Sequence, residues 1–155
     1  MANINGRQLR DRLTRLLPDR TYLTRKNFLL DAEKNFFNKC AYCNQELPLT
    51  REHVVSNMEG GTMELANIIP ACRGCNDDKR ETPWREYAQK KNSQFIEVIE
   101  KKIQGYNPLD LVDIRKMTDP AIKNAFDKYD ARIREIDNMR KMKHSARNVS
   151  KLKKA

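Results

Sequence analysis

The chain has 155 residues, enough for one compact domain or a small core with helical arms. Charged residues make up 34% of it and apolar residues 39%, and no apolar run reaches membrane-spanning length. Arginines recur between Arg7 and Arg20 without the apolar stretch of a signal peptide, so we expect an intracellular, cytoplasmic protein. The net charge of +10 favours a polyanionic partner, nucleic acid ahead of an anionic membrane surface.

Residues 1–38 are predicted to form an N-terminal helical segment. The first helix has one apolar face, which consists of Leu9, Leu13, Leu16 and Leu17. Pro18 and Asp19 end this helix. Thr24 is suited to cap a second helix, whose apolar side consists of Phe28, Ala32 and Phe36.

Residues 39–81 differ in character, because they contain all four cysteines and two short β-like runs, at 53–55 and 67–69. Gly60 and Gly61 lie between these runs and indicate a hairpin-like connection of uncertain length. The polar stretch from Cys75 to Arg80 is typical of a short helix. We therefore predict a small ββα unit here.

Residues 82–143 are predicted to be helical again. Thr82-Pro83 and Asp119-Pro120 both resemble a cap followed by proline at the first helical position. One apolar face follows the first of these signals and consists of Trp84, Ala88, Phe95, Ile99 and Ile103. A longer face follows the second and consists of Ile122, Phe126, Tyr129, Ile133, Ile136 and Met139. This longer face is interpreted as a packing surface or as a seam for a homodimer or a protein partner.

The end of the chain is strongly basic. Residues 131–155 contain nine basic residues against two acidic ones. Residues 144–155 lack apolar periodicity, and we expect them to form a disordered basic tail.

The four cysteines form two Cys-x-x-Cys pairs, Cys40 with Cys43 and Cys72 with Cys75, separated by 28 residues. In an intracellular protein this spacing predicts one tetrahedral zinc site with four thiolate ligands. The alternative is four metal-free thiols that pack as small apolar groups. A site closed by four sulfurs has no open coordination position, so we interpret the zinc as structural and expect the chemistry elsewhere.

The stretch from Cys40 to Lys79 resembles the four-cysteine branch of the HNH endonuclease family. Between and after the cysteine pairs it has Glu52-His53, then Asn67-Ile68-Ile69, then Asn76 directly after Cys75. The resemblance covers about a quarter of the chain, and the flanking helical zones lie outside it. It implies an α+β fold, mostly helical overall, with a ββα-metal core and a structural zinc knuckle between N- and C-terminal helices.

The resemblance also implies roles for single residues. His53 matches the general base, and Glu52 and Asn76 match the ligands of a catalytic divalent ion. Asn67 matches the asparagine that orients the histidine through backbone hydrogen bonds. We expect nucleic-acid contacts from basic residues near the site and in the arm, namely Arg73, Lys79, Arg140, Lys141 and Lys143.

The chemical requirements of phosphodiester hydrolysis support these assignments independently. The reaction needs a deprotonated water and a cation that stabilises the negative charge developing on the phosphate. Neutral imidazole suits the first task, and carboxylate and amide oxygens suit Mg²⁺ or Mn²⁺. Two departures weaken the match: Glu52 stands where the family more often has aspartate, and Ser56 where it often has proline.

The sequence therefore predicts a DNA endonuclease, with RNA as an open alternative substrate and no membrane partner. A zinc-stabilised nucleic-acid-binding module without catalysis is the second hypothesis. The third is a nuclease active only within a packaging or defence complex, in which the apolar face that begins at Ile122 would bind a partner helix. The resemblance to small freestanding nucleases of the kind that phages encode also favours a phage origin.

Overall fold

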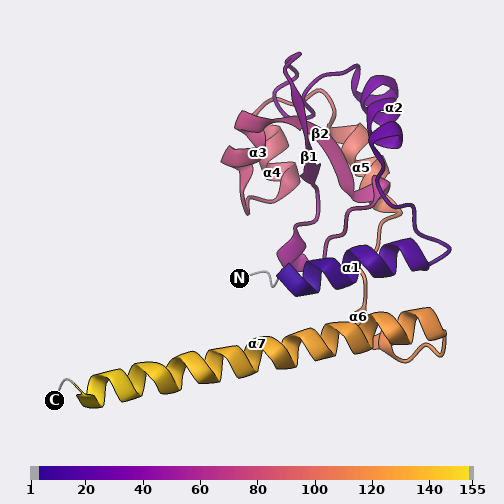
Figure 1. Cartoon of the computed structure of the whole chain (residues 1–155). Coiled ribbons are helices and arrows are strands. Elements are labelled where there is room, and N and C mark those ends of the chain that lie inside the picture. Colours follow the sequence, from indigo (N-terminus) through magenta and orange to yellow (C-terminus); the bar gives the residue numbers. More distant parts are fainter. Residues whose placement is uncertain (1–3, 154–155) are drawn as a thin grey trace.

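The structure is a computed structural model that describes residues 4–153. It is mostly helical, with one small antiparallel sheet, which confirms the predicted α+β class (Figure 1). The sheet and helices α2–α5 form one packed body, and the long helix α7 lies along α1 beneath it. Among the described residues, no helix is both long and apolar enough to cross a lipid bilayer.

The N-terminal segment contains two helices, α1 (Ile4–Leu16) and α2 (Arg25–Phe36). Thr24 caps α2 as predicted, because its hydroxyl accepts a hydrogen bond from the backbone N–H of Asn27. The Asn27 side chain accepts one from the N–H of Thr24 in return. The apolar faces of both helices point inward, and their buried residues are Leu9, Leu13, Phe28, Ala32 and Phe36.

The sheet consists of β1 (Leu49–His53) and β2 (Ile68–Cys72), in a register that sets His53 opposite Ile68. The predicted first strand at residues 53–55 was wrong in position, since regular pairing ends at His53. The reason is local: the backbone N–H of Val55 donates to the side chain of Asn67, at 2.8 Å, instead of to a partner strand.

Residues 54–67 connect the two strands and contain two short 3-10 helices, η1 (Asn57–Glu59) and η2 (Leu65–Asn67). The two glycines lie within this connection, as predicted. Gly60 has a φ of +85°, which closes η1 in the left-handed region. The backbone N–H of Gly61 donates to the carbonyl oxygen of Ser56, at 2.8 Å, and so folds the loop back on itself.

Helix α3 (Arg73–Lys79) follows β2 directly and begins two residues before the predicted start, because Cys72 caps it. The chain then turns sharply at Arg80, whose φ of 45° and ψ of −117° are rare for any residue with a side chain. The backbone N–H of Thr82 closes this turn on the carbonyl oxygen of Lys79, at 2.9 Å.

Two further helices cover the sheet, α4 (Trp84–Lys90) and α5 (Ile96–Gln104). Pro83 precedes α4 instead of opening it, so the predicted start is displaced by one residue. The apolar face predicted from Trp84 to Ile103 is divided between these two helices. Its buried members join α2 and β2 in the main core, which includes Phe36, Tyr42, Ile69, Tyr87, Ala88, Phe95 and Ile99.

The C-terminal region contains α6 (Leu111–Arg115), which the sequence analysis did not predict, and α7 (Pro120–Lys153). Asp119 caps α7 as predicted, because its carboxylate accepts from the N–H groups of Ala121 and Ile122. The first turns of α7 pack against α1 in a second core, which includes Leu9, Leu13, Leu109, Ile122, Ala125 and Phe126.

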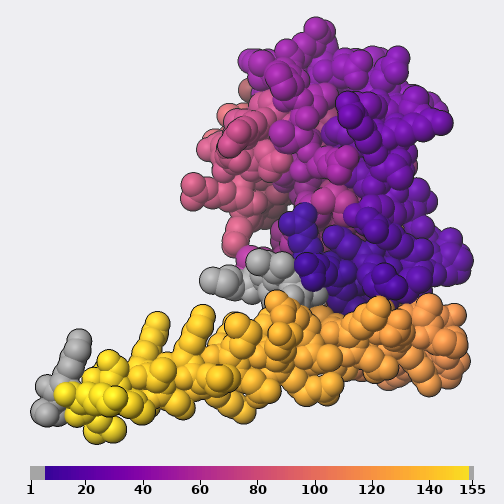
Figure 2. All heavy atoms as spheres, viewed as in Figure 1, coloured from indigo at the N-terminus to yellow at the C-terminus, as the bar shows by residue number. Residues whose placement is uncertain are grey.

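Helix α7 continues far beyond this core. Residues 144–153 are helical, in contrast to the predicted disordered tail, and residues 154–155 lie outside the described part of the chain. The sequence from 121 to 153 contains neither glycine nor proline and is rich in good helix formers. In the described chain no residue after Phe126 is buried, and the C-terminal half of α7 projects as an arm (Figure 2).

Replacing Gly61 with alanine should destabilise the protein, because a Cβ there would lie 1.8 Å from the carbonyl oxygen of Val55. We expect a loss of about 1–3 kcal/mol in the free energy of unfolding, measured by urea denaturation. Gly74→Ala is the matched control, since no described heavy atom lies within 4 Å of its would-be Cβ in α3. A Gly61→Ala variant as stable as Gly74→Ala would contradict the close packing of this loop.

Candidate metal centre and catalytic site

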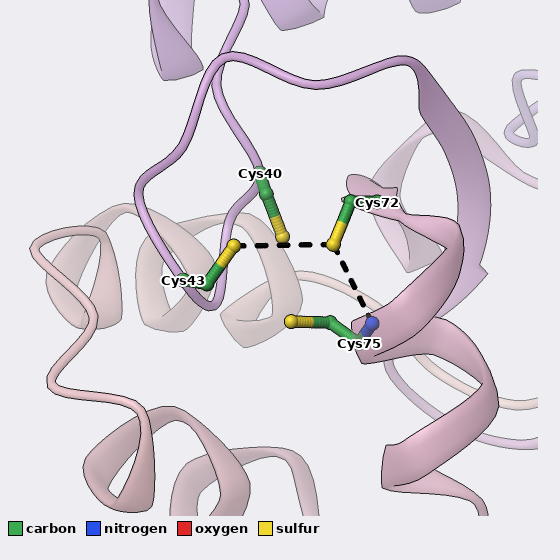
Figure 3. A group of neighbouring side chains, drawn as sticks. All are labelled: Cys40, Cys43, Cys72 and Cys75. Carbon is green, nitrogen blue, oxygen red and sulfur yellow. Dashed lines mark hydrogen bonds between the residues drawn. The ribbon is translucent and has the colours of Figure 1, made fainter.

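Four cysteine side chains converge between the loop after α2 and the start of α3 (Figure 3). Cys40 and Cys43 come from the loop, Cys72 from the end of β2 and Cys75 from the first turn of α3. Their sulfur atoms all lie within 4.8 Å of one another, and those of Cys43 and Cys72 are 3.9 Å apart. The sequence expectation that the two pairs meet at one point is confirmed.

Backbone hydrogen bonds hold both cysteine pairs in tight turns. The N–H of Cys75 donates to the sulfur of Cys72, at 3.4 Å, and the N–H of Asn44 donates to the carbonyl oxygen of Cys40, at 3.0 Å. Asn44 adopts a φ of 65°, a conformation that asparagine tolerates better than most residues. Each turn therefore presents two sulfurs toward a common centre.

The dimensions of this cluster fit zinc. A tetrahedral zinc ion with Zn–S bonds of about 2.3 Å separates its sulfur ligands by roughly 3.8 Å. Without a cation, burial raises the pKa of the Cys40 and Cys75 thiols. Burial also acts to raise the pKa of Cys72. Hydrogen bonds, of which the one from the Cys75 N–H has the largest effect, outweigh burial and lower the pKa of Cys72 overall. A divalent ion would neutralise the thiolates, so the cluster suggests a structural zinc site.

Glu52, the predicted ligand of a catalytic ion, points into the protein from β1. Its carboxylate lies 3.1 Å from the ammonium of Lys79, and both side chains are almost completely buried. Burial raises the pKa of Glu52, while the charge of Lys79 opposes that rise. Lys79 was predicted to contact a phosphate. In this structure α3 turns its side chain inward, where it pairs with Glu52, and the phosphate contact stays a prediction.

Asn76, the second predicted ligand, lies on α3 against the same strand. Its side-chain Nδ2 donates to the hydroxyl of Thr50, at 2.9 Å, and to the carbonyl oxygen of Arg51, at 3.3 Å. These bonds fix the amide so that its oxygen is the atom left to meet a cation. The oxygen donors of Asn76 and Glu52 are the kind that Mg²⁺ or Mn²⁺ prefers, although Lys79 occupies the carboxylate here.

His53, the predicted base, ends β1 and is largely enclosed. Within the described chain, its Nε2 atom is buried and has no hydrogen-bond partner. Burial, followed by the positive charges of Arg7, Lys79 and Arg10, lowers the pKa of the imidazole from 6.5 to about 4. The histidine is therefore neutral at physiological pH.

Asn67 anchors the loop that follows His53. Its side-chain oxygen accepts from the N–H of Val55, at 2.8 Å. Its Nδ2 donates to the carbonyl oxygens of Val55, at 3.0 Å, and of Thr62, at 2.9 Å. All of these bonds go to backbone atoms on the far side of the loop, so the completely buried Asn67 fixes the path of the chain after His53.

Two residues near His53 were not singled out by the sequence analysis. Arg7 and Arg10 of α1 place positive charge beside the imidazole, and Arg10 also donates to the carbonyl oxygen of Asn57, at 3.1 Å. The buried Nε of Arg10 has no partner among the described residues. The signal in the sequence was the recurrence of arginines from Arg7 to Arg20, but nothing in it showed that α1 reaches the ββα unit.

The other predicted nucleic-acid contacts lie apart from this centre. The Arg73 side chain is 87% exposed at the start of α3 and is 3.6 Å from the carboxylate of Asp77. Arg140, Lys141 and Lys143 are exposed on the projecting arm of α7. The structure thus separates the predicted residues into a central group on β1 and α3 and a basic group on the arm.

The sequence model of the HNH endonuclease family matches residues 40–91. These residues are therefore similar to HNH endonuclease domains, and we call them the HNH domain. The match covers about a third of the chain and includes α4, so it extends beyond the predicted core of 39–81. The domain indicates a nuclease acting on nucleic acid, and the cysteine cluster is consistent with the zinc-containing branch. No curated protein and no solved structure gives a significant match to the chain.

Loss of zinc should unfold the HNH domain, because the metal replaces part of a core that so small a unit cannot build alone. We expect Cys75→Ser to lose bound zinc and more than about 3 kcal/mol of stability, measured by elemental analysis and urea denaturation. Arg73→Gln, an exposed substitution between Cys72 and Cys75, should keep both the bound zinc and the stability. Full zinc content and stability in Cys75→Ser would contradict a structural site.

The buried neutral His53 should make the zinc-loaded protein sensitive to acid when no catalytic divalent ion is bound. The pKa of His53 falls from 6.5 in the unfolded chain to about 4 in the folded one. Folding therefore favours the neutral imidazole, and its contribution to the free energy of unfolding is fully present above pH 6.5. That effect is lost as the pH falls from 6.5 through 4, by at most about 3 kcal/mol and less for a partly exposed side chain.

Urea denaturation at pH 7.5 and 4.5 measures this loss. We expect His53→Gln to lose less stability between the two pH values than the wild type, since the other acid-sensitive groups are unchanged. His144→Gln, on the exposed arm, should behave like the wild type. Equal pH dependence in all three proteins would show that His53 titrates normally.

Proposed function

We propose that the protein is an endonuclease that hydrolyses phosphodiester bonds of DNA, with His53 as the general base. The observation that supports this most strongly is the imidazole itself. It is neutral, largely buried, and has a nitrogen without a described partner, inside a domain that matches HNH endonucleases. Buried polar atoms without a partner are rare in proteins, and a catalytic role is one of the explanations for them.

In this mechanism His53 accepts a proton at Nε2 from the attacking water. The low pKa of His53 keeps the imidazole in its basic form over the whole physiological range. Asn67 holds the loop behind the histidine by its bonds to Val55 and Thr62, and so keeps the ring oriented. Asn67 is therefore a positioning residue.

The remaining task is stabilisation of negative charge on the phosphate. Glu52 and Asn76 would hold a single divalent ion such as Mg²⁺ or Mn²⁺, which supplies that stabilisation when bound. Arg7 and Arg10 would add two fixed positive charges beside His53. Their place on α1 means that a helix outside the HNH domain would contribute to substrate binding.

The basic arm would bind the DNA backbone beyond the cut. Arg140, Lys141 and Lys143 lie on it, and exposed basic residues gain affinity for DNA by displacing its condensed counterions. Arg73 would make a similar contact nearer to the site. None of these contacts reads a base, so the arm would strengthen binding without selecting a sequence.

A second function is favoured by one observation, the pairing of Glu52 with Lys79. A carboxylate that is neutralised by a lysine lacks the free charge that a divalent ion needs. If that pair were permanent, the protein would be a zinc-stabilised DNA-binding module without turnover. A protein of that kind would bind DNA tightly and leave it intact.

Replacing His53 with alanine should abolish cleavage. We expect the wild type to nick or cut supercoiled plasmid with Mg²⁺ or Mn²⁺, and His53→Ala to be slower by at least about 100-fold, as loss of a general base predicts. His144→Ala is the matched control, since these are the two histidines of the chain.

Both variants must retain zinc and a cooperative unfolding transition for the comparison to count. Undiminished cleavage by His53→Ala would remove the assigned base. Tight binding without cleavage by the wild type in every divalent metal would favour the binding module instead.

Substitution of three arm residues by glutamine, at Arg140, Lys141 and Lys143, should weaken DNA binding and its dependence on salt. We expect the slope of log K against log salt to fall by about 0.9 per lost phosphate contact, or roughly 3 in total. The control replaces Arg25, Lys26 and Lys34, exposed on α2 across the core from α7. Fluorescence anisotropy measures the DNA affinity of the two triple variants at several salt concentrations. Equal slopes for the two variants would contradict a role for the arm.

A further inference from the structure

A buried lysine forms an ion pair with the carboxylate that the catalytic ion would need. The Nζ of Lys79 and the Oε1 of Glu52 are 3.1 Å apart, and their side chains are only 4% and 8% exposed. A charge this far from solvent requires a partner, and each residue provides one for the other. The pair is therefore a stable arrangement in the absence of a metal.

The backbone bends sharply directly after Lys79. Lys79 is the last residue of α3, and Arg80 immediately leaves the helix with a φ of 45° and a ψ of −117°. Residues with a side chain avoid that region, so the turn is strained. It is closed by the bond from the N–H of Thr82 to the carbonyl oxygen of Lys79. The lysine is thus held in place by the fold around it.

We propose that Lys79 is a resident cation that competes with the divalent ion for Glu52, so that metal binding requires the ammonium to leave the carboxylate. The inference rests on the proposed function, because it takes Glu52 as the metal ligand. Two cations at one carboxylate repel each other, and this repulsion is strong where water is excluded. Metal affinity is consequently weakened by the energy of the ion pair.

The displaced ammonium has a place to go. Lys79 also lines a groove of about 250 Å³ between the loop at 54–59 and the turn at 79–84, together with Glu59 and Glu81. These two carboxylates are exposed, and a phosphate lying in the groove would serve equally well as a partner. The predicted contact between Lys79 and a phosphate then belongs to the metal-bound state.

The test is Mn²⁺ binding by zinc-loaded protein without DNA, measured by electron paramagnetic resonance and calorimetry at pH 8. At this pH a proton is less able to replace the ammonium on Glu52. We expect Lys79→Gln to bind Mn²⁺ about tenfold more tightly than the wild type, a typical size for coupling between two sites. Lys79→Arg keeps the positive charge and should stay near the wild-type affinity.

Lys91→Gln is the matched control, because Lys91 lies in the same domain and is 4.0 Å from a different carboxylate, that of Asp78. It should bind Mn²⁺ like the wild type. Zinc content and unfolding curves establish that each variant is folded, and Lys79→Met replaces Lys79→Gln if the glutamine variant is not.

Unchanged or weaker Mn²⁺ binding by the neutral variants would overturn the proposal, and so would an absence of binding in all of them. Glu52→Gln separates this failure from failure of the proposed function. If Glu52→Gln binds Mn²⁺ as well as the wild type does, then Glu52 is not the ligand and the assigned metal site is wrong. If Glu52→Gln loses Mn²⁺ binding while Lys79→Gln binds Mn²⁺ no more tightly than the wild type, then Glu52 is a metal ligand and only the proposed competition by Lys79 is wrong.

Discussion

Four sulfur atoms within 4.8 Å of one another define the centre of this protein. They join the loop after α2 to the point where β2 ends and α3 begins. Because Cys72 both ends β2 and caps α3, the direction of that helix is set at the same point. Asn76 and Lys79 lie on α3, so their positions against β1 follow from the position of the cysteines.

Around this centre the distribution of charge is uneven. The imidazole of His53 is surrounded by the positive charges of Arg7, Arg10 and Lys79, which lower its pKa together with burial. The carboxylate of Glu52 lies inside the same unit and is paired with one of these cations. An anion approaching the histidine would therefore meet positive charge from the HNH domain and from α1 together.

The sequence predicted the parts of this structure that depend on local chemistry. The cysteine pairs, the caps at Thr24 and Asp119 and the buried faces of α1 and α2 all follow from residue type and spacing, and the structure contains them. The ββα order was also predicted, although β1 ends earlier than expected, at His53, because Asn67 captures the backbone of Val55.

What could not be predicted depends on contacts between distant segments. The packing of α7 on α1 and the approach of α1 to His53 join residues far apart in the chain, and no local pattern encodes them. The burial of Lys79 has the same origin. Its place after a Cys-x-x-Cys pair was consistent with a surface contact, and the packing of α3 against β1 directs it inward. The roles of Glu52, His53, Asn67 and Asn76 stay predictions.

The length of α7 has a consequence for the scale of recognition. A helix of 34 residues is about 51 Å long at a rise of 1.5 Å per residue. Duplex DNA rises about 3.4 Å per base pair, so a duplex parallel to this rod would run beside it for roughly 15 base pairs. That footprint exceeds one turn of the double helix.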